Sequence, residues 1–336
     1  MATIHDVARA AGVSISTVSY ALSGKRSIAA TTRQRVDDAV RELGYRPHAG
    51  ARMLAGARTH ILALSAPLHE DGHLPTHMRF VTAVVETARK NDYDVLLLAT
   101  DDEVSGIRRV ASSSLVDAVV VMGVNEVDER VDLVDALSLP ASFIGVPRNG
   151  GAMSCVDLDF EQAGFTTVES LAALGHRSIG IIGHPHSYLD RETNFIRRFN
   201  DGVEAASAAH GVEIARVWPE IGRIPAQDAF DELRETLPGM TALVFHCNEP
   251  VVEAVLGRIR QLELDVPGDL SVFAACASYA TDLLEVPLSS IPLPLDDMCR
   301  IAVENVLRLV RGSDEHGVTL LAPVYVDRGS VAAVGA

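Results

Sequence analysis

Residues 3–24 have the sequence TIHDVARAAGVSISTVSYALSG, two helix-sized segments that meet at Gly12. Thr3 and Asp6 stand at the spacing of a capping box, in which a hydroxyl and a carboxylate satisfy free backbone amides of a starting helix. The apolar residues recur at intervals of three and four, as on one face of an amphipathic helix: Ile4, Val7, Ala8 and Ala11. The stretch therefore predicts a short helix, a tight reversal and a second helix that Ser14 caps.

A third helix is expected to end at Tyr45-Arg46-Pro47, and its apolar residues keep the same spacing: Val36, Ala39, Val40 and Leu43. Three short helices around a small core predict a helix-turn-helix module. The second helix carries mostly small, hydroxyl-bearing side chains off its apolar face, near its N-terminus, which lets such a helix enter the major groove of DNA. These residues are Ile15, Ser16, Thr17, Ser19 and Tyr20. The alternatives are a helical protein-docking module and a lid.

The charge of the chain is unevenly distributed. The 336 residues carry a formal net charge of −16, yet the first 58 hold nine Lys and Arg against four Asp and Glu. A basic head on an acidic body is expected when only the head meets phosphate. There is no apolar run of membrane-spanning length and no secretory signal at the start of the sequence. The four scattered cysteines are typical of buried thiols, so a cytoplasmic protein is expected.

The rest of the chain alternates short apolar runs with helical patterns. The runs predicted as buried parallel strands are ILALSA (61–66), DVLLLAT (94–100), DAVVVMG (117–123), SIGIIG (178–183), TALVFH (241–246) and LSVFAA (270–275). Such repetition predicts parallel sheets covered on both faces by helices, and the number of units suggests two similar lobes. Ligands bind beyond the carboxyl ends of the strands in sheets of this kind.

No motif in the sequence supports catalysis, a cofactor or a metal site. The chain has no GxSxG elbow, phosphate loop, complete dinucleotide fingerprint or zinc-hydrolase helix. His184-Pro-His186 has no local carboxylate or cysteine at ligand spacing, which favours an ordinary loop over a metal site. We expect neither an enzyme nor a cofactor.

The first 58 residues resemble the DNA-binding head and hinge of the lactose-repressor/galactose-repressor (LacI/GalR) family of bacterial transcription regulators. The resemblance rests on DVARAAGVSISTVSYAL and on TRQRVDDAVRELGYRPHAGARMLAG. It implies base-reading roles for Ile15, Ser16 and Tyr20. It also implies phosphate contacts for Ser14, Thr17, Ser19, Thr32 and Tyr45.

Residues 48–56 resemble the hinge helix of that family, in which a leucine wedges between base pairs in the minor groove. The resemblance implies that Leu54 is the wedge, that Ala51 is the small residue beside it and that Arg52 meets phosphate. Gly50 departs from the family pattern, and glycine costs about 1 kcal/mol in a helix interior. The hinge is therefore expected to depend on DNA and dimer contacts for its order. The alternative is a flexible linker.

The remainder resembles, less tightly, the family's core domain, which is similar to periplasmic sugar-binding proteins. The segments ALGHRSIGIIG, DVPGDLSVFAA and VPLSSIPLPLDDMCRIAVENVLRLV carry this resemblance. It implies an all-α helix-turn-helix head followed by an α/β two-lobed core. The expected divisions are a head over 1–46, a hinge and linker over 47–59, and a core over 60–336, with lobe 1 at about 60–157 and 290–320 and lobe 2 at about 158–289 and 321–336. The residues expected to bind an effector in the cleft are Ser65, Asp159, Arg197, Arg198, Asn248 and Glu249.

The function expected from this resemblance is a homodimeric transcriptional regulator, a repressor, that binds double-stranded DNA at a near-palindromic operator and responds to a small-molecule effector. The alternatives are a DNA-binding regulator without a ligand and a cleft-type ligand-binding protein. Gly145 and the segment Ala274 to Ser278 stand where the family has sugar-binding carboxylates. We therefore expect an effector with fewer hydroxyls than a monosaccharide, or an anion held by Arg197 or Arg198, or no small-molecule control.

Overall fold

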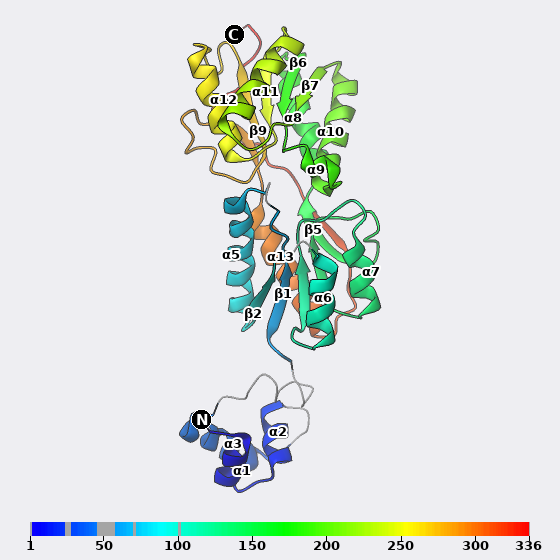
Figure 1. The fold of residues 1–336 in the computed structure, drawn as a ribbon, viewed down its shortest axis with the longest axis vertical. Coiled ribbons are helices and arrows are strands. Elements are labelled where there is room, and N and C mark those ends of the chain that lie inside the picture. The colour runs from blue at the N-terminus through cyan, green and yellow to red at the C-terminus, as the bar shows by residue number, and fades with distance from the viewer. Residues whose placement is uncertain (1, 24–27, 46–57, 70–71, 100–101, 336) are drawn as a thin grey trace.

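The computed structural model describes residues 2–23, 28–45, 58–69, 72–99 and 102–335, which form a helical head and two α/β lobes (Figure 1). The bounds of the head helices are α1 (Ile4–Ala11), α2 (Ile15–Ser23) and α3 (Ala30–Leu43). None of the helices within these ranges is long and apolar enough to cross a membrane.

The head folds around a small apolar core, as its spacing predicts. The capping box is formed: the Thr3 hydroxyl accepts from the Asp6 amide at 3.4 Å, and the Asp6 carboxylate accepts from the Thr3 amide at 2.9 Å. Gly12 ends α1 with a φ of 63°, a conformation that glycine adopts without a Cβ penalty. The fully buried side chains come from all three helices: Val7, Val18 and Val36. Leu43 was expected on the inner face of α3 but is exposed, because the helix ends there.

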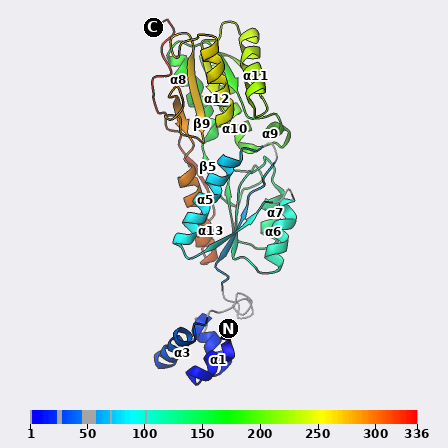
Figure 2. The same cartoon turned by 60° about the vertical axis from the view of Figure 1, so that its left-hand side comes forward.

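Lobe 1 is a six-stranded parallel sheet in the order β11-β5-β4-β3-β1-β2. Its strands are β1 (Ile61–Ser65), β2 (Asp94–Leu98), β3 (Ala118–Val121), β4 (Ala141–Ile144), β5 (Ser154–Leu158) and β11 (Val318–Leu321). Its helices are α5 (Leu74–Lys90), α6 (Glu103–Ser112), α7 (Glu129–Ala136) and α13 (Leu295–Val310). The view in Figure 2 shows α5 and α13 side by side on one face, with α6 and α7 on the other.

Lobe 2 is a five-stranded parallel sheet in the order β10-β9-β8-β6-β7. Its strands are β6 (Ser178–Ile182), β7 (Glu213–Val217), β8 (Ala242–Phe245), β9 (Ser271–Ala277) and β10 (Ser289–Pro292). Its helices are α8 (Phe160–Ala173), α9 (Ser187–Asp190), α10 (Asn194–His210), α11 (Arg223–Thr236) and α12 (Glu249–Gln261). The prediction of two α/β lobes with parallel sheets is confirmed.

The chain crosses between the lobes three times: after β5, after β10 and after β11. The sheets place Ser290 in lobe 2, where it bridges to Val326, and they keep Leu321 in lobe 1. The chain leaves these strands after Leu158, Pro292 and Leu321, and the limits of the two lobes stay a prediction. The limits of the head and hinge stay a prediction, since residues 46–57 lie outside the described ranges.

Candidate DNA-reading helix and ligand cavity

Helix α2 presents part of its surface to solvent. Ile15 is 40% exposed and Tyr20 is 36% exposed, although both are large apolar or aromatic side chains. Ser16 is also exposed. Ser14 caps the helix as expected, because its hydroxyl accepts from the Thr17 amide at 3.1 Å. The result is a capped helix that carries exposed side chains and backbone amides on one accessible face.

The remaining residues expected at DNA differ in their surroundings. Ser19 and Thr32 are half-buried. Tyr45 is only 5% exposed and packs in the core of the head, so its expected phosphate contact could involve little more than its hydroxyl. Ala51, Arg52 and Leu54 lie outside the described residues, and their roles stay predictions.

A cavity of about 170 Å³ lies between the two lobes. Lobe 1 contributes the start of α5 and the segments after β3 and β4, whereas lobe 2 contributes the segments after β6, β8 and β9 and the start of α10. The cavity therefore lies at the carboxyl ends of both sheets, where open α/β folds bind their ligands.

Histidines contribute polar groups to both walls of this cavity. His73 and His77 come from the start of α5, His184 follows β6 and His246 follows β8. Burial lowers the pKa of each: that of His184 falls to about 4, and that of His246 falls well below its ordinary value. Desolvation disfavours the charged imidazolium, so these rings are neutral at pH 7, each with one N–H donor and one acceptor.

Aromatic rings surround the imidazoles of lobe 2. His184 stacks on Tyr188 with a centroid distance of 5.0 Å, and it meets the edge of Phe195 at 5.3 Å. His246 stacks on Phe199 at 3.9 Å. These contacts hold the two imidazoles in place and give the wall an aromatic surface.

Several buried polar atoms of residues that line the cavity have no hydrogen-bond partner among the described residues. They are Nδ1 of His184, Nε2 of His246, Nε2 of His77, Nδ2 of Asn248 and both amide atoms of Asn194. An unpaired polar atom that is buried destabilises a folded protein by about 1–3 kcal/mol. Buried atoms of this kind are rare in proteins, and these gather in one place.

Only Asn248 of the six residues expected to bind an effector lines the cavity. Ser65 is buried at the end of β1, and its hydroxyl accepts from Arg130 at 3.3 Å. Asp159 caps α8, and Glu249 is the first residue of α12. These three expectations came from strand ends and family spacing, which place a residue near the cleft without deciding where its side chain points.

The two arginines expected to hold an anion lie outside the cavity lining, and both are paired with carboxylates. Arg198 donates to Asp157 at 2.7 Å, an ion pair that joins α10 of lobe 2 to β5 of lobe 1. Arg197 pairs with Glu126 at 3.2 Å and with Asp201 at 2.5 Å. Burial raises the pKa of Asp157 to about 7, and the Arg198 guanidinium opposes this shift. Neither arginine is therefore placed to bind a ligand in the cavity.

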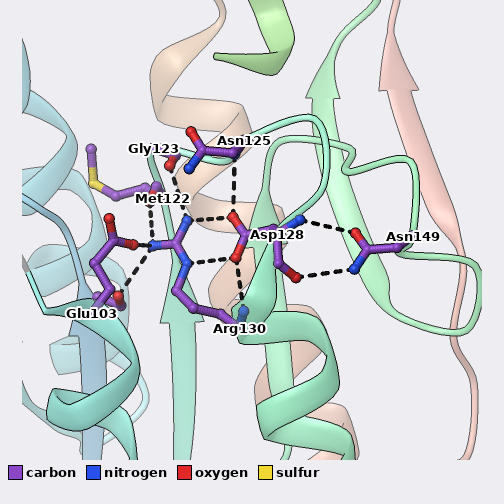
Figure 3. Close-up of polar contacts among 8 residues, drawn as sticks. Glu103, Met122, Gly123, Asn125, Asp128, Arg130 and Asn149 are labelled. Atoms are coloured by element: carbon purple, nitrogen blue, oxygen red, sulfur yellow. Dashed lines mark hydrogen bonds and ion pairs between the residues drawn. The ribbon is translucent and has the colours of Figure 1, made fainter. Parts of the chain in front are cut away.

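Figure 3 shows a buried network that fixes the lobe 1 wall. Arg130 is 2% exposed, and its Nε and Nη2 donate to the two carboxylate oxygens of Asp128 at 2.8 and 2.6 Å. It also donates to the carbonyls of Met122 and Gly123 at 3.1 and 2.9 Å, and it pairs with Glu103. Met122 and Gly123 line the cavity, so the network holds this wall in position.

Two segments that we call the interlobe clasp, residues 124–126 and 192–194, join the lobes beside the cavity. The Glu126 amide donates to the Glu192 carbonyl at 2.9 Å, and the Asn194 amide donates to the Val124 carbonyl at 3.1 Å. Asn125 and Thr193 form an antiparallel bridge between these bonds. Asn125, Thr193 and Asn194 also line the cavity, so the clasp and the cavity share residues.

Comparisons with known proteins match two family models to the chain. The family described as bacterial regulatory proteins, lacI family, matches residues 3–48, and the periplasmic binding protein-like domain matches residues 168–331. The HTH-type transcriptional repressor PurR of Pasteurella multocida (strain Pm70) is 29% identical over 98% of this chain and 99% of its own length. The ribose operon repressor of Escherichia coli (strain K12) is 25% identical over 98% and 100%.

Solved structures share the same fold along nearly the whole chain. A lac repressor dimer bound to operator and the anti-inducer ONPF superposes with a TM-score of 0.79 at 22% identity, over 99% of both chains. The transcriptional regulator CelR in complex with cellobiose has a TM-score of 0.69 at 23% identity, over 98% of this chain and 100% of its own.

Proposed function

The chain belongs to the lacI family of bacterial regulatory proteins and is a DNA-binding transcriptional regulator, and on this premise we propose that it is a cytoplasmic, homodimeric repressor of a near-palindromic operator. A small molecule in the interlobe cavity controls it. The observation that carries the proposal is the capped helix α2, which exposes Ile15, Ser16 and Tyr20 on a head with its own core. The relatives named as repressors support repression rather than activation.

Recognition of DNA is divided between base edges and phosphates. Base edges in the major groove carry the sequence information, whereas phosphate contacts fix the register. We assign base reading to Ile15, Ser16 and Tyr20, and phosphate contact to Ser14, Thr17, Ser19, Thr32 and Tyr45. The hinge residues Ala51, Arg52 and Leu54 would enter the minor groove between the two half-sites.

An apolar face on lobe 1 supports the dimer. Leu74, Met78 and Val85 follow one another along one side of α5, and all three are exposed, as is Leu97 on the edge strand β2. A second copy of the chain would cover this face. We expect Met78→Glu together with Val85→Glu to give monomers in analytical ultracentrifugation. Ile224→Glu, at an exposed position on α11, should leave the dimer intact.

The action of the core is binding rather than catalysis. Its cavity lies between lobes that the clasp and the Arg198–Asp157 pair connect, so an occupant would contact both. Any occupant that prefers one arrangement of the lobes shifts the balance between operator-bound and released states, typically by about 1–3 kcal/mol.

A mobility-shift assay on the DNA upstream of the protein's own gene tests this function. We expect a complex that survives competition by unrelated DNA and that weakens steeply with salt, because cations of the head meet phosphate. Substitution of Ile15 should change the preferred sequence, while the affinity for unrelated DNA stays the same. No preference over random DNA of the same length would rule out the proposed operator.

A further inference from the structure

The unpaired polar atoms of the cavity define the chemistry of its occupant. Asn194 is 2% exposed, and neither Nδ2 nor Oδ1 of its side chain has a hydrogen-bond partner among the described residues. His184, His246 and Asn248 add further unpaired atoms on the same wall. A ligand that supplies partners for these atoms makes hydrogen bonds that an apolar ligand of equal size does not make.

Both the donor Nδ2 and the acceptor Oδ1 of the Asn194 side chain are unpaired, so this side chain favours a ligand that presents an acceptor beside a donor. An asparagine side chain makes two parallel hydrogen bonds with a planar edge that carries a donor beside an acceptor, as it does with adenine in DNA. Ring compounds with an amide-like edge have this pattern. The neutral imidazoles of His184 and His246 extend it, since each offers one donor and one acceptor.

The charged groups of the cavity wall are already engaged. Asp157 is bound to Arg198, and Arg191 lies over the Tyr188 ring at 4.9 Å. A charged ligand would have to compete with these contacts in a buried site, where an unpaired charge is strongly disfavoured. The wall therefore favours an uncharged occupant.

The size and surface of the cavity favour a flat ring. An apolar cavity of about 150 Å³ accommodates benzene, and this one measures about 170 Å³. Phe160, Phe195 and Tyr188 give one wall an aromatic surface on which a planar ring can pack. A free monosaccharide is thicker and needs a partner for every hydroxyl, which carboxylates normally provide.

We propose that the effector is a small, uncharged nitrogen heterocycle whose donor–acceptor edge is bound by the Asn194 amide. This inference rests on the proposed function, because it names the ligand class of the cavity that controls the repressor. It also suggests how the ligand acts. The Asn194 backbone amide belongs to the interlobe clasp, so a ligand held by its side chain strengthens the contact between the lobes.

Calorimetric titration of the full chain with individual compounds tests the ligand class. The probes are uracil, nicotinamide and hypoxanthine as uncharged heterocycles, glucose as an uncharged polyol and citrate as an anion. We expect at least one heterocycle to bind at least tenfold more tightly than glucose and citrate. Tighter binding of glucose or citrate, or no binding of any heterocycle, would overturn the proposal.

Two substitutions at Asn194 test the contact itself. Asn194→Leu removes both unpaired atoms, so it should abolish heterocycle binding and leave the ligand-free melting temperature unchanged or higher. Asn194→Asp keeps the shape but loses the donor, and it should weaken binding by at least tenfold. The matched control is Asn305→Leu: Asn305 is also buried, but it accepts from Arg308 on α13 outside the cavity, so this variant should bind the heterocycle normally.

The proposed contact would be refuted if both Asn194 variants kept their affinity for the heterocycle and Asn194→Leu lowered the melting temperature. Asn194 would then have a structural role only. Mobility-shift assays on the same preparations separate this failure from that of the proposed function. Operator binding without heterocycle binding refutes only the ligand class. Heterocycle binding without operator binding refutes only the repressor.

Discussion

The head and the interlobe cavity are both recognition regions, but they are built in opposite ways. The head exposes Ile15, Ser16 and Tyr20 on one helix over a satisfied core. The cavity wall contains the buried Asn194 and His246 and the half-buried His184, which come from separate segments and have unpaired polar atoms. We therefore expect that the proposed DNA-reading surface can change without disturbing its fold, whereas changes in the cavity wall alter the stability of the core.

The largest effect is expected at the network that supports the cavity wall. Arg130→Met leaves the buried carboxylate of Asp128 without its guanidinium, which should lower the free energy of unfolding of the core by about 3–5 kcal/mol. Chemical denaturation measures this change. Arg300→Met is the matched control, since Arg300 forms exposed pairs with Asp297 and Glu304 and should contribute less than about 1 kcal/mol. If both variants lowered the free energy of unfolding equally, the cavity wall would contribute no more to the stability of the core than an exposed surface does.

A substitution on the exposed face of the head should change DNA affinity and leave stability unchanged. Ser16→Glu places a carboxylate on the exposed face of α2, where it would meet the negative charge of DNA. We expect operator affinity to fall by at least about 100-fold, or about 2.7 kcal/mol, with an unchanged melting temperature. Ser112→Glu on α6 adds the same charge to lobe 1 and controls for net charge. If Ser16→Glu unfolded the head, the claim that its reading surface is separate from its core would fail.

Acid should act on the core through the cavity histidines. The pKa of His184 is about 4 in the folded chain against an ordinary value of 6.5, so the unfolded chain binds more protons between these values. The stabilisation by neutral His184 is complete above pH 6.5 and is lost as the pH falls towards 4. Between pH 7 and pH 5 the wild type should therefore lose about 2 kcal/mol more than His184→Gln. If the free energy of unfolding fell equally with pH in the two proteins, the folded chain would not lower the pKa of His184.

The smallest effect concerns the start of the head. Thr3→Ala removes the hydroxyl that caps α1, which should destabilise that helix by about 1 kcal/mol. Hydrogen exchange of the α1 amides in the full chain should accelerate about fivefold, while amides of the core keep their protection. Faster exchange in the core as well would show that the head and the core do not unfold separately.

The sequence predicts much of the fold because local spacing determines it. The six predicted strands are continuous apolar runs, and each lies in a parallel sheet as β1, β2, β3, β6, β8 or β9. The strands that were not predicted have weaker patterns. β7 has the sequence EIARV and lies at a sheet edge, so only one of its residues is buried. β5 is fully buried, but its run SCVDL contains a serine and an aspartate.

The two recognition regions also differ in how far the sequence predicts them. The exposed face of α2 follows from a helical period within nine residues, so Ile15 and Tyr20 could be found locally. The cavity residues come from distant segments that only the folded sheets bring together. The sequence contained one signal, His184-Pro-His186, but of these two only His184 lines the cavity, and His186 is exposed. Asn194 carried no signal, because an unpaired amide is a property of the folded environment.

The central claim is that ligand bound by buried groups in the cavity changes how tightly the exposed helix holds its operator. Fluorescence anisotropy with labelled operator, measured with and without a saturating heterocycle, tests this claim most directly. The wild type should change its operator affinity by about 5–150-fold. Asn194→Leu should keep the ligand-free affinity and lose the change. An unaltered wild-type affinity, or an equal change in the Asn194→Leu variant, would contradict the claim.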